Sequence, residues 1–189
     1  MGRIILASGS PRRKELLQRI GIHDFVIVKP DVEEWYPENL TPQEIVSYIS
    51  REKSGAVTAE ADDIVITADT MVFLGDRRLG KPANEADALE MLTALQGQRH
   101  TVCTGVTVRQ GDHMITRAQS TDVYFRSASR DELIRYIRSG EPMDKAGAYG
   151  IQEQGALLVE RIDGDFFNVM GLPVLLLSQM LHEFGIALL

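Results

Sequence analysis

The sequence predicts an α/β protein built on a mixed, twisted central sheet that is flanked by helices. Short β-branched runs alternate along the chain with segments of helical periodicity, and this alternation is typical of α/β architecture. Hairpin signals occur among the crossover signals, so we expect a mixed sheet rather than a purely parallel one. With 189 residues, of which 44% are hydrophobic, the chain can bury a sizeable core. We therefore expect residues 1–189 to form a single domain.

The N-terminal segment predicts a strand, a loop of small residues and a helix. Residues 3–6 indicate a buried strand, because the apolar side chains of Ile4, Ile5 and Leu6 follow Arg3. Ser10 and Pro11 are typical of a helix start, with a hydroxyl at the N-cap and a proline at the first helical position. An apolar stripe follows, and Gly21 stands where the helix should end.

Two arginines, Arg12 and Arg13, lie in the first turn of this expected helix. Cations are unfavourable there, because the unpaired N–H groups already make the helix N-terminus positive. Their position therefore predicts an anion, held together with Ser8 and the rest of the small-residue loop. We favour this interpretation over two solvated arginines on a surface helix.

The rest of the chain continues the alternation of strands and helices. Capping boxes that begin at Thr41 and Ser129 mark two helix starts. The elements expected next, in chain order, are a strand over residues 25–29, a helix from 42 to about 59, a buried strand over 64–66 that ends at Asp69, a hairpin that turns at residues 75–76, a helix capped by Asn84, strands over 101–108 and 121–125, a helix from 130 that stops at Gly140, a strand over 156–162 and a last helix from Pro173.

Composition limits the classes of function. The net charge of −7 argues against broad binding to nucleic acid or anionic membranes, since either would need a basic face. The single cysteine, Cys103, excludes an internal disulfide and a thiolate-rich metal site, and its β-branched surroundings predict a buried thiol. No signal-peptide pattern begins the chain, and the most apolar segment, residues 174–189, is too short and too interrupted to span a bilayer. We therefore expect a cytoplasmic protein that binds neither nucleic acid nor membrane.

Asp69 is the first candidate for chemistry, because it follows the run of β-branched residues at 64–66. Ligands of open α/β sheets bind at the carboxyl ends of the strands. A carboxylate at that edge could hold a divalent cation or accept a proton from water. The alternative is a turn aspartate that bonds to its own backbone.

Asp31, Glu33 and Glu34 form an acidic cluster in the loop after the expected second strand. One or two carboxylates, completed by water and phosphate oxygens, are the ligands that Mg²⁺ prefers. The alternative is a solvated charge cluster.

Lys53 lies on the apolar stripe of the expected helix over residues 42–59, four residues after Ile49. A lysine on an inward face either extends its ammonium to the surface or borders a wet cleft, where the ammonium could lie near phosphate. Its position alone does not separate the two.

Residues 75–81 match the pattern G-x-x-x-x-G-K, but Pro82 replaces the hydroxyl that holds Mg²⁺ in a P-loop, and the segment lies in a hairpin. We therefore reject a P-loop, although Lys81 could still reach a phosphate.

The glycines and alanines of residues 144–152 would let a ligand approach the backbone closely; the alternative is a flexible loop. The histidines show no metal-ligand spacing, and zinc-hydrolase and serine-esterase motifs are absent from the sequence.

Residues 7–17, ASGSPRRKELL, resemble the opening signature of the Maf family of nucleoside triphosphate pyrophosphatases. The resemblance covers nearly the whole chain, and these blocks occur in the same order as in the family. It implies an inosine-triphosphatase-like fold with two lobes around a cleft, and possible homodimers follow from the family alone. The later blocks are residues 68–70 (ADT), 80–82 (GKP), 97–106 (GQRHTVCTGV), 140–152 (GEPMDKAGAYGIQ) and 171–173 (GLP).

The resemblance also implies a reaction, in which water attacks the α-phosphorus of a nucleoside triphosphate to give the monophosphate and pyrophosphate. Asp69 would accept the proton, and Asp69 with Glu33, favoured over Glu34, would hold Mg²⁺ or Mn²⁺. A metal-held Asp69 could not also be a free base, so these roles are alternatives or need a second ion. The groups implied to hold the phosphates are Ser8, Arg12, Arg13, Lys53, Lys81 and Lys145, and Lys53, Lys81 and Glu33 are implied in catalysis.

Arg12, Thr70 and Gln152 together resemble the branch of the family that acts on dTTP and UTP. We therefore expect dTTP, UTP and modified pyrimidine triphosphates such as 5-methyl-UTP as substrates. The Gln152 amide could pair with N3–H and O4 of uracil, provided that its orientation is fixed. Glu153 stands where the family often has glycine, so the resemblance does not fix the backbone conformation at this position. The rival functions are a septum-formation regulator without enzymatic activity and a nucleotide-dependent phosphotransferase.

Overall fold

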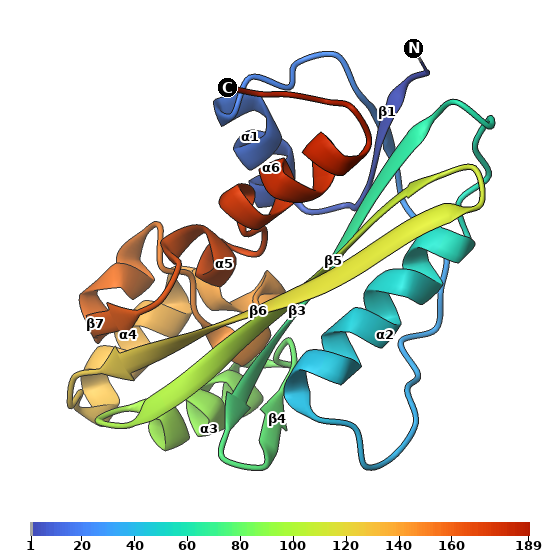
Figure 1. The fold of residues 1–189 in the computed structure, drawn as a ribbon. Helices are drawn as coiled ribbons and strands as arrows, with labels where there is room; N and C mark the ends of the chain where they lie inside the picture. Colours follow the sequence, from blue (N-terminus) through green and yellow to red (C-terminus); the bar gives the residue numbers. More distant parts are fainter. Residues whose placement is uncertain (1) are drawn as a thin grey trace. The chain divides into compact units, whose positions relative to one another are not determined.

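The computed structural model describes residues 2–189, which form a mixed seven-stranded sheet with helices beside it (Figure 1). The strand order is β2-β1-β3-β5-β6-β7, and β4 pairs with β3. Strands β2, β1 and β3 run parallel, whereas β4 is antiparallel to β3 and β7 is antiparallel to β6, so the predicted mixed sheet is confirmed. The strands are β1 (Ile4–Ala7), β2 (Val26–Val28), β3 (Ile64–Leu74), β4 (Arg77–Leu79), β5 (Arg99–Gln110), β6 (His113–Phe125) and β7 (Val159–Asp163).

The helices begin at the signals that the sequence provides. Pro11 and Pro42 are the first residues of their helices, and both predicted capping boxes, at Thr41 and Ser129, are formed. The side chain of Asn84 accepts a hydrogen bond from Asp87 N at 2.9 Å, as a helix N-cap does. The α-helices are α1 (Pro11–Arg19), α2 (Pro42–Gly55), α3 (Glu85–Leu95), α4 (Arg130–Arg138), α5 (Phe166–Met170) and α6 (Val174–Glu183), and three 3₁₀ helices are η1 (Glu141–Asp144), η2 (Ala146–Ala148) and η3 (Gln154–Leu158).

The chain divides into two compact units. The first extends up to Asp69 and also contains Thr104–Gln119 and Gly171–Leu189, and the second contains Thr70–Cys103 and Ser120–Met170. The boundary passes through the strands β3, β5 and β6 rather than through linkers. The single domain expected over residues 1–189 stays a prediction.

In the first unit, helix α2 packs tightly on the sheet. A Cβ atom at Gly105 of β5 would overlap the backbone carbonyl of Val46, so only glycine permits this approach. The buried Ser50 hydroxyl donates to Thr107 Oγ1 at 2.9 Å, and Thr67 Oγ1 donates to the Ser50 carbonyl at 2.7 Å. Because such buried bonds need good geometry, they fix α2 against β3 and β5.

In the second unit, helices α3 and α4 pack together, and both bury the apolar residues that face inward. The β3–β4 hairpin turns at residues 75–76, and Val72 lies opposite Leu79. Residues 75–79 therefore form the turn and second strand of a hairpin, with residues 80–81 just after it, rather than the strand–loop–helix of a P-loop. Cys103 is buried, as predicted, and its Sγ lies 3.2 Å from Ser120 Oγ.

The bounds of several expected elements need correction. Strand β3 does not end at Asp69 but continues to Leu74, so Asp69 is neither a strand terminus nor a turn residue. Helix α2 ends at Gly55 rather than near residue 59, because the chain tightens into a bond from Val57 N to Ser54 O. Strand β6 begins earlier than expected, at residue 113, and η3 replaces the first part of the strand expected over 156–162. Helix α5 was not expected from the sequence. Among residues 2–189, no helix is both long enough and apolar enough to cross a membrane.

The capping box of α4 predicts a pH-dependent contribution to stability. Hydrogen bonds from Ser129, and then from Arg126, lower the pKa of Glu132 from 4.5 to about 2. A carboxyl group whose pKa is lowered in the folded state stabilises the fold at pH values above its ordinary pKa. This contribution is lost as the pH falls from about 4.5 towards 2. Thermal unfolding of Glu132→Gln should therefore show a lower Tm than the unmodified chain at neutral pH and a vanishing difference in strong acid. Glu160→Gln, at an exposed position of β7, is the control, and a Tm difference that persists unchanged in acid would contradict the expectation.

Candidate active site

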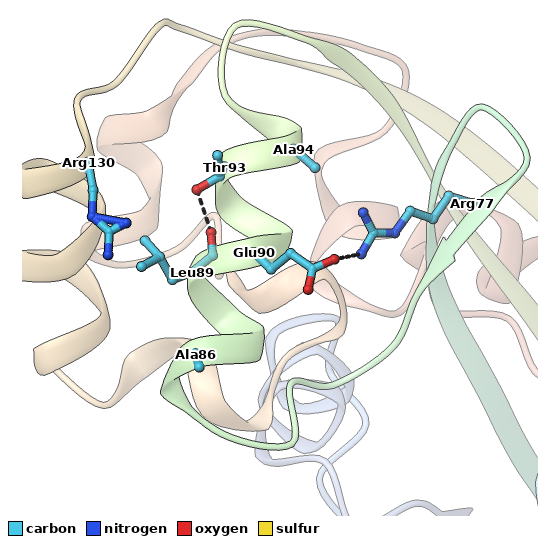
Figure 2. Close-up of a pocket in the computed structure, with 7 residues that line it drawn as sticks. All are labelled: Arg77, Ala86, Leu89, Glu90, Thr93, Ala94 and Arg130. Atoms are coloured by element: carbon cyan, nitrogen blue, oxygen red, sulfur yellow. Dashed lines mark hydrogen bonds and ion pairs between the residues drawn. The ribbon is translucent and has the colours of Figure 1, made fainter.

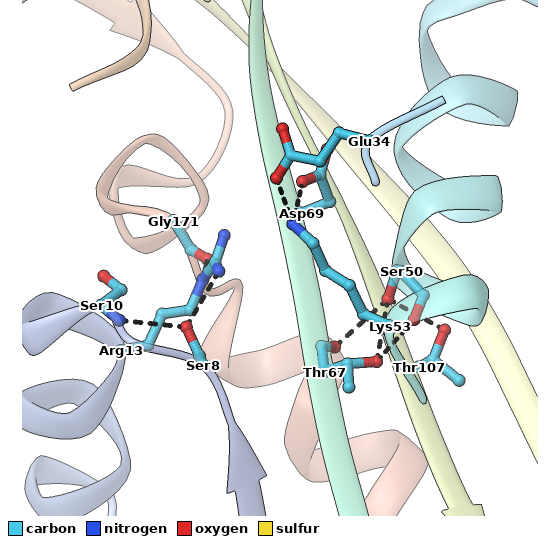
Figure 3. Close-up of polar contacts among 10 residues, drawn as sticks. All are labelled: Ser8, Ser10, Arg13, Glu34, Ser50, Lys53, Thr67, Asp69, Thr107 and Gly171. Carbon is cyan, nitrogen blue, oxygen red and sulfur yellow. Dashed lines mark hydrogen bonds and ion pairs between the residues drawn. The ribbon is translucent and has the colours of Figure 1, made fainter. Parts of the chain in front are cut away.

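The loop between β1 and α1 is organised around Ser8 and Arg13 (Figure 3). The buried Ser8 Oγ accepts hydrogen bonds from Ser10 N and from Arg13 Nη1, both at 3.2 Å. Arg13 Nε donates to the carbonyl of Gly171 at 2.7 Å, which ties the loop to the segment before α6. Burial lowers the pKa of Arg13 to about 10, while the nearby Asp69 opposes this shift. The guanidinium therefore stays protonated at neutral pH in a partly desolvated place.

The N-terminus of α1 has the features of an anion site. Ser10 occupies the predicted N-cap, but its hydroxyl makes no capping hydrogen bond, and the first turn contains no acidic residue. The cap bond expected from the sequence is thus absent, and Ser10 instead donates its backbone N–H to the Ser8 hydroxyl. A helix N-terminus without a carboxylate or a capping side chain presents its N–H groups to a bound anion.

A second group joins α2 to β3 in the same unit. Lys53 Nζ lies 2.7 Å from Asp69 Oδ1 and 2.8 Å from Glu34 Oε1. The Lys53 and Asp69 side chains are 14% and 7% exposed, respectively. The side chain of Lys53 therefore lies inward, as its place on the apolar stripe predicted, and its charge is paired rather than exposed.

Asp69 uses its two carboxylate oxygens differently. Oδ1 accepts from Lys53, whereas Oδ2 is buried and has no hydrogen-bond partner within residues 2–189. A buried polar atom without a partner costs about 1–3 kcal/mol, and more when it is charged. Such an atom in a native fold is accounted for by strain, an ordered water, an ion or a role in catalysis.

The local fold explains how these side chains come together. Strands β1 and β3 are parallel, with Leu6 opposite Ile66, so β1 ends at Ala7 while β3 continues to Asp69 and beyond. Asp69 therefore lies level with the loop that follows β1, although its own strand does not end there. Lys53 lies one turn after Ser50, whose bonds to β3 and β5 fix α2, so its ammonium reaches Asp69.

The acidic cluster reaches the lysine–aspartate pair through Glu34, while the expectation that Glu33 holds a cation stays a prediction. The structure places Glu34, rather than Glu33, in contact with Lys53, and all three carboxylates of the cluster are exposed. The backbone carbonyl of Glu33 accepts from Trp35 N at 2.8 Å. Residues 2–189 contain no group of three or more His, Cys, Asp or Glu side chains that could hold a metal ion on their own.

The second unit contains the other predicted site residues. Lys81 is exposed in the loop after β4, where the Gly80 carbonyl accepts from Gly147 N at 3.0 Å. Lys145 Nζ donates to the Glu141 carbonyl at 2.7 Å and to Asp144 at 2.9 Å. Thr70 is half-buried in β3, next to Asp69, and Gln152 is half-buried in the bend before η3.

A separate hollow on the second unit involves none of the predicted residues (Figure 2). It is bordered by Arg77, which pairs with Glu90 of α3 at 2.6 Å, and by Arg130 at the start of α4. The rest of its lining comes from α3: Ala86, Leu89, Thr93 and Ala94. Because Glu90 pairs with Arg77 and most of the remaining lining is small or apolar, this hollow lacks the clustered positive charge that a phosphate would need.

Sequence reasoning missed two contributors to the first unit's site. One is the backbone carbonyl of Gly171, which binds Arg13; the resemblance at residues 171–173 pointed to this segment without giving its role. The other is Lys29, whose methylene groups would contact a Cβ at Gly9 at 3.8 Å and thus lie beside the small-residue loop. The only signal for Lys29 was its position at the end of the expected strand.

Fold and site together define an α/β protein with an arginine-bearing helix N-terminus and a buried lysine–aspartate pair. The family model described as Maf-like protein matches residues 3–184, and the chain belongs to this family. It is 48% identical over 185 residues to the dTTP/UTP pyrophosphatase of Bacillus velezensis, covering 97% of each chain. It is 46% identical over 187 residues to the dTTP/UTP pyrophosphatase of Bacillus cereus strain ZK / E33L, covering 98% of this chain and 97% of the relative.

A solved structure supports the fold. The Ham1 protein of Staphylococcus aureus is similar with a TM-score of 0.50 and 17% identity, and the match covers 96% of this chain and 99% of that one. The inosine-triphosphatase-like (Ham1) fold implied by the sequence resemblance is therefore confirmed at the level of architecture.

The arginine at the helix N-terminus predicts a measurable affinity for phosphate groups. Arg13→Ala should weaken binding of inorganic pyrophosphate about 10- to 100-fold, since hydrogen bonds to charged groups contribute about 1.5–3 kcal/mol. Isothermal titration calorimetry would measure this. Arg19→Ala is the matched control, because Arg19 lies at the other end of the same helix and pairs with Glu15 at 2.6 Å. Equal affinities of Arg13→Ala and the unmodified chain would exclude the anion site.

Proposed function

We propose that this chain is a nucleoside triphosphate pyrophosphatase that hydrolyses dTTP and UTP to the monophosphate and pyrophosphate. The observation that carries the proposal is Asp69, a buried carboxylate with Oδ1 held by Lys53 and Oδ2 left without a partner within residues 2–189. Membership of the Maf-like family and relatives named dTTP/UTP pyrophosphatase support the substrate class.

The reaction needs positive charge around the triphosphate and a water molecule held in line with the bond that breaks. Ser8, Arg12 and Arg13 would bind phosphate oxygens, together with the N–H groups at the start of α1. Lys53, Lys81 and Lys145 would add cationic contacts. Lys145 would exchange its bond to the exposed Asp144 side chain for a phosphate oxygen.

Asp69 Oδ2 would accept the proton of the attacking water. The water oxygen forms a bond to the α-phosphorus, the bond from that phosphorus to the α–β bridging oxygen breaks, and pyrophosphate leaves with the electron pair. Lys53 holds Oδ1, so the carboxylate presents Oδ2 in one orientation. A base fixed in this way needs no reorganisation during the reaction.

The donor set also fits a divalent cation that is bound with the substrate. Asp69 and Glu34 would hold Mg²⁺ or Mn²⁺, with phosphate oxygens completing the shell, because Mg²⁺ sites commonly use one or two carboxylates. When bound, the cation offsets phosphate charge and acidifies water. A carboxylate that holds a cation is no longer a free base, so the two proposed roles of Asp69 are alternatives or need a second ion.

Base recognition is assigned to Gln152, with Arg12 and Thr70 contributing to specificity. A glutamine amide offers an acceptor and a donor side by side, which match N3–H and O4 of uracil or thymine. This pairing would favour UTP, dTTP and 5-substituted forms such as 5-methyl-UTP over CTP and purine triphosphates. A cytoplasmic location and a homodimer stay predictions.

Product analysis tests the proposed reaction. With UTP and Mg²⁺, the chain should release UMP and pyrophosphate, as measured by anion-exchange chromatography. Asp69→Asn keeps the side-chain size but removes its basicity, so kcat should fall roughly 10²- to 10⁴-fold. A circular-dichroism spectrum checks that the variant is folded. Release of γ-phosphate, or Asp69→Asn activity within a few-fold of the unmodified chain, would refute the proposal.

Adjacent glutamates test the assignment of the cation site. Glu34→Gln should raise the Mg²⁺ concentration needed for half-maximal activity about ten-fold or more, because one charged ligand is lost. Glu33→Gln is the matched control in the same loop and should change it little. If Glu33→Gln has the larger effect, Glu33 is the ligand and the contact between Glu34 and Lys53 is only an ion pair.

A further inference from the structure

Two side chains of the second unit hold the segment that carries Gln152. Tyr136, near the end of α4, accepts a hydrogen bond from Gly150 N at 3.1 Å and donates to Glu141 Oε1 at 2.8 Å. The Glu141 carboxylate in turn accepts from Gly155 N at 3.1 Å and from Gln154 N at 2.9 Å. The phenol and the carboxylate thus bind both ends of residues 150–155.

The same segment is closed on itself by close packing. A Cβ at Gly155 would overlap the carbonyl of Gly150 and would lie 2.5 Å from Tyr136 Oη, so only glycine fits there. Ile151 is buried, while Gln152 is half-buried between the two pinned ends. Residues 150–155 therefore form a short closed loop, and Tyr136 is 6% exposed beneath it.

Aromatic packing fixes the residue that leads into the loop. Tyr149 is 5% exposed, and its hydroxyl lies 2.7 Å from His100 Nε2 of β5. The Phe125 ring stands edge-on to both, at centroid distances of 4.7 Å from Tyr149 and 4.9 Å from His100. The backbone therefore enters the loop from a rigid, buried anchor.

We infer that Tyr136 and Glu141 are positioning residues for base selection, because they hold the loop that presents the Gln152 amide. This inference rests on the proposed function, in which Gln152 reads the base. An amide can turn over to pair with cytosine as well as with uracil, so its discrimination requires a fixed orientation. A loop tied at both ends limits that freedom, and a loosened loop would accept both bases.

The variants Tyr136→Phe and Glu141→Gln test the inference. The first keeps the buried ring and removes only the hydroxyl, and the second keeps the side-chain size. The ratio of kcat/KM for UTP to that for CTP should fall about ten-fold in both, while kcat for UTP falls by less than the ratio does. The matched controls are Tyr124→Phe, which removes a hydroxyl that makes no bond to residues 150–155, and Glu160→Gln on β7. Both controls should keep the UTP-to-CTP ratio of the unmodified chain.

A double-mutant cycle separates positioning from general destabilisation. Gln152→Ala should flatten the same ratio, and adding Tyr136→Phe to it should flatten the ratio no further, because both act through one amide. Hydrogen exchange at the amides of Gly150, Gln154 and Gly155 should accelerate in Glu141→Gln independently of activity. An unchanged ratio in folded Tyr136→Phe and Glu141→Gln, with a flattened ratio in Gln152→Ala, would overturn the inference alone. No hydrolysis of UTP by the unmodified chain would refute the proposed function instead.

Discussion

The ion pair between Lys53 and Asp69 is the interaction on which the site depends. Burying two charges is costly, and a buried pair is stable only with close geometry and further hydrogen bonds. The fold supplies that geometry through the glycine contact between β5 and α2 and through the bonds of Ser50 to β3 and β5. Yet one oxygen of Asp69 is left without a partner among residues 2–189. This free oxygen, next to a held one, is the reason for proposing chemistry at Oδ2.

The sequence was most informative where structure depends on neighbouring residues. Proline at the first helical position, the capping boxes at Thr41 and Ser129 and the cap at Asn84 act within one turn, so their outcome does not depend on tertiary contacts. Asp69 shows where this reasoning fails. An aspartate after a β-branched run suggested the end of a strand, but Lys53, from another element, compensates the charge and lets the strand continue. Tertiary contacts override local propensity at such positions.

The parts of the site that could not be predicted are those set by the path of the backbone. Consecutive side chains of an extended segment point in different directions, so the choice between Glu33 and Glu34 depends on how residues 29–41 run. The Gly171 carbonyl that binds Arg13 leaves no side-chain signal at all. Tyr136 and Glu141 look like an ordinary helix end, and only their bonds to residues 150–155 give them a role.

The division of the chain separates two tasks that the proposed reaction requires. The charged groups around Asp69, together with the arginine loop, belong to one compact unit, whereas the loop of Gln152 and its two tethering side chains belong to the other. The boundary falls between Asp69 and Thr70, so the proposed proton acceptor and a specificity residue are neighbours in one strand. Under this proposal, a change in the bonds that hold residues 150–155 would alter base selection while the lysine–aspartate pair stays in place. In the proposed mechanism, specificity therefore depends on how the loop of residues 150–155 is held, and hydrolysis depends on Asp69 Oδ2.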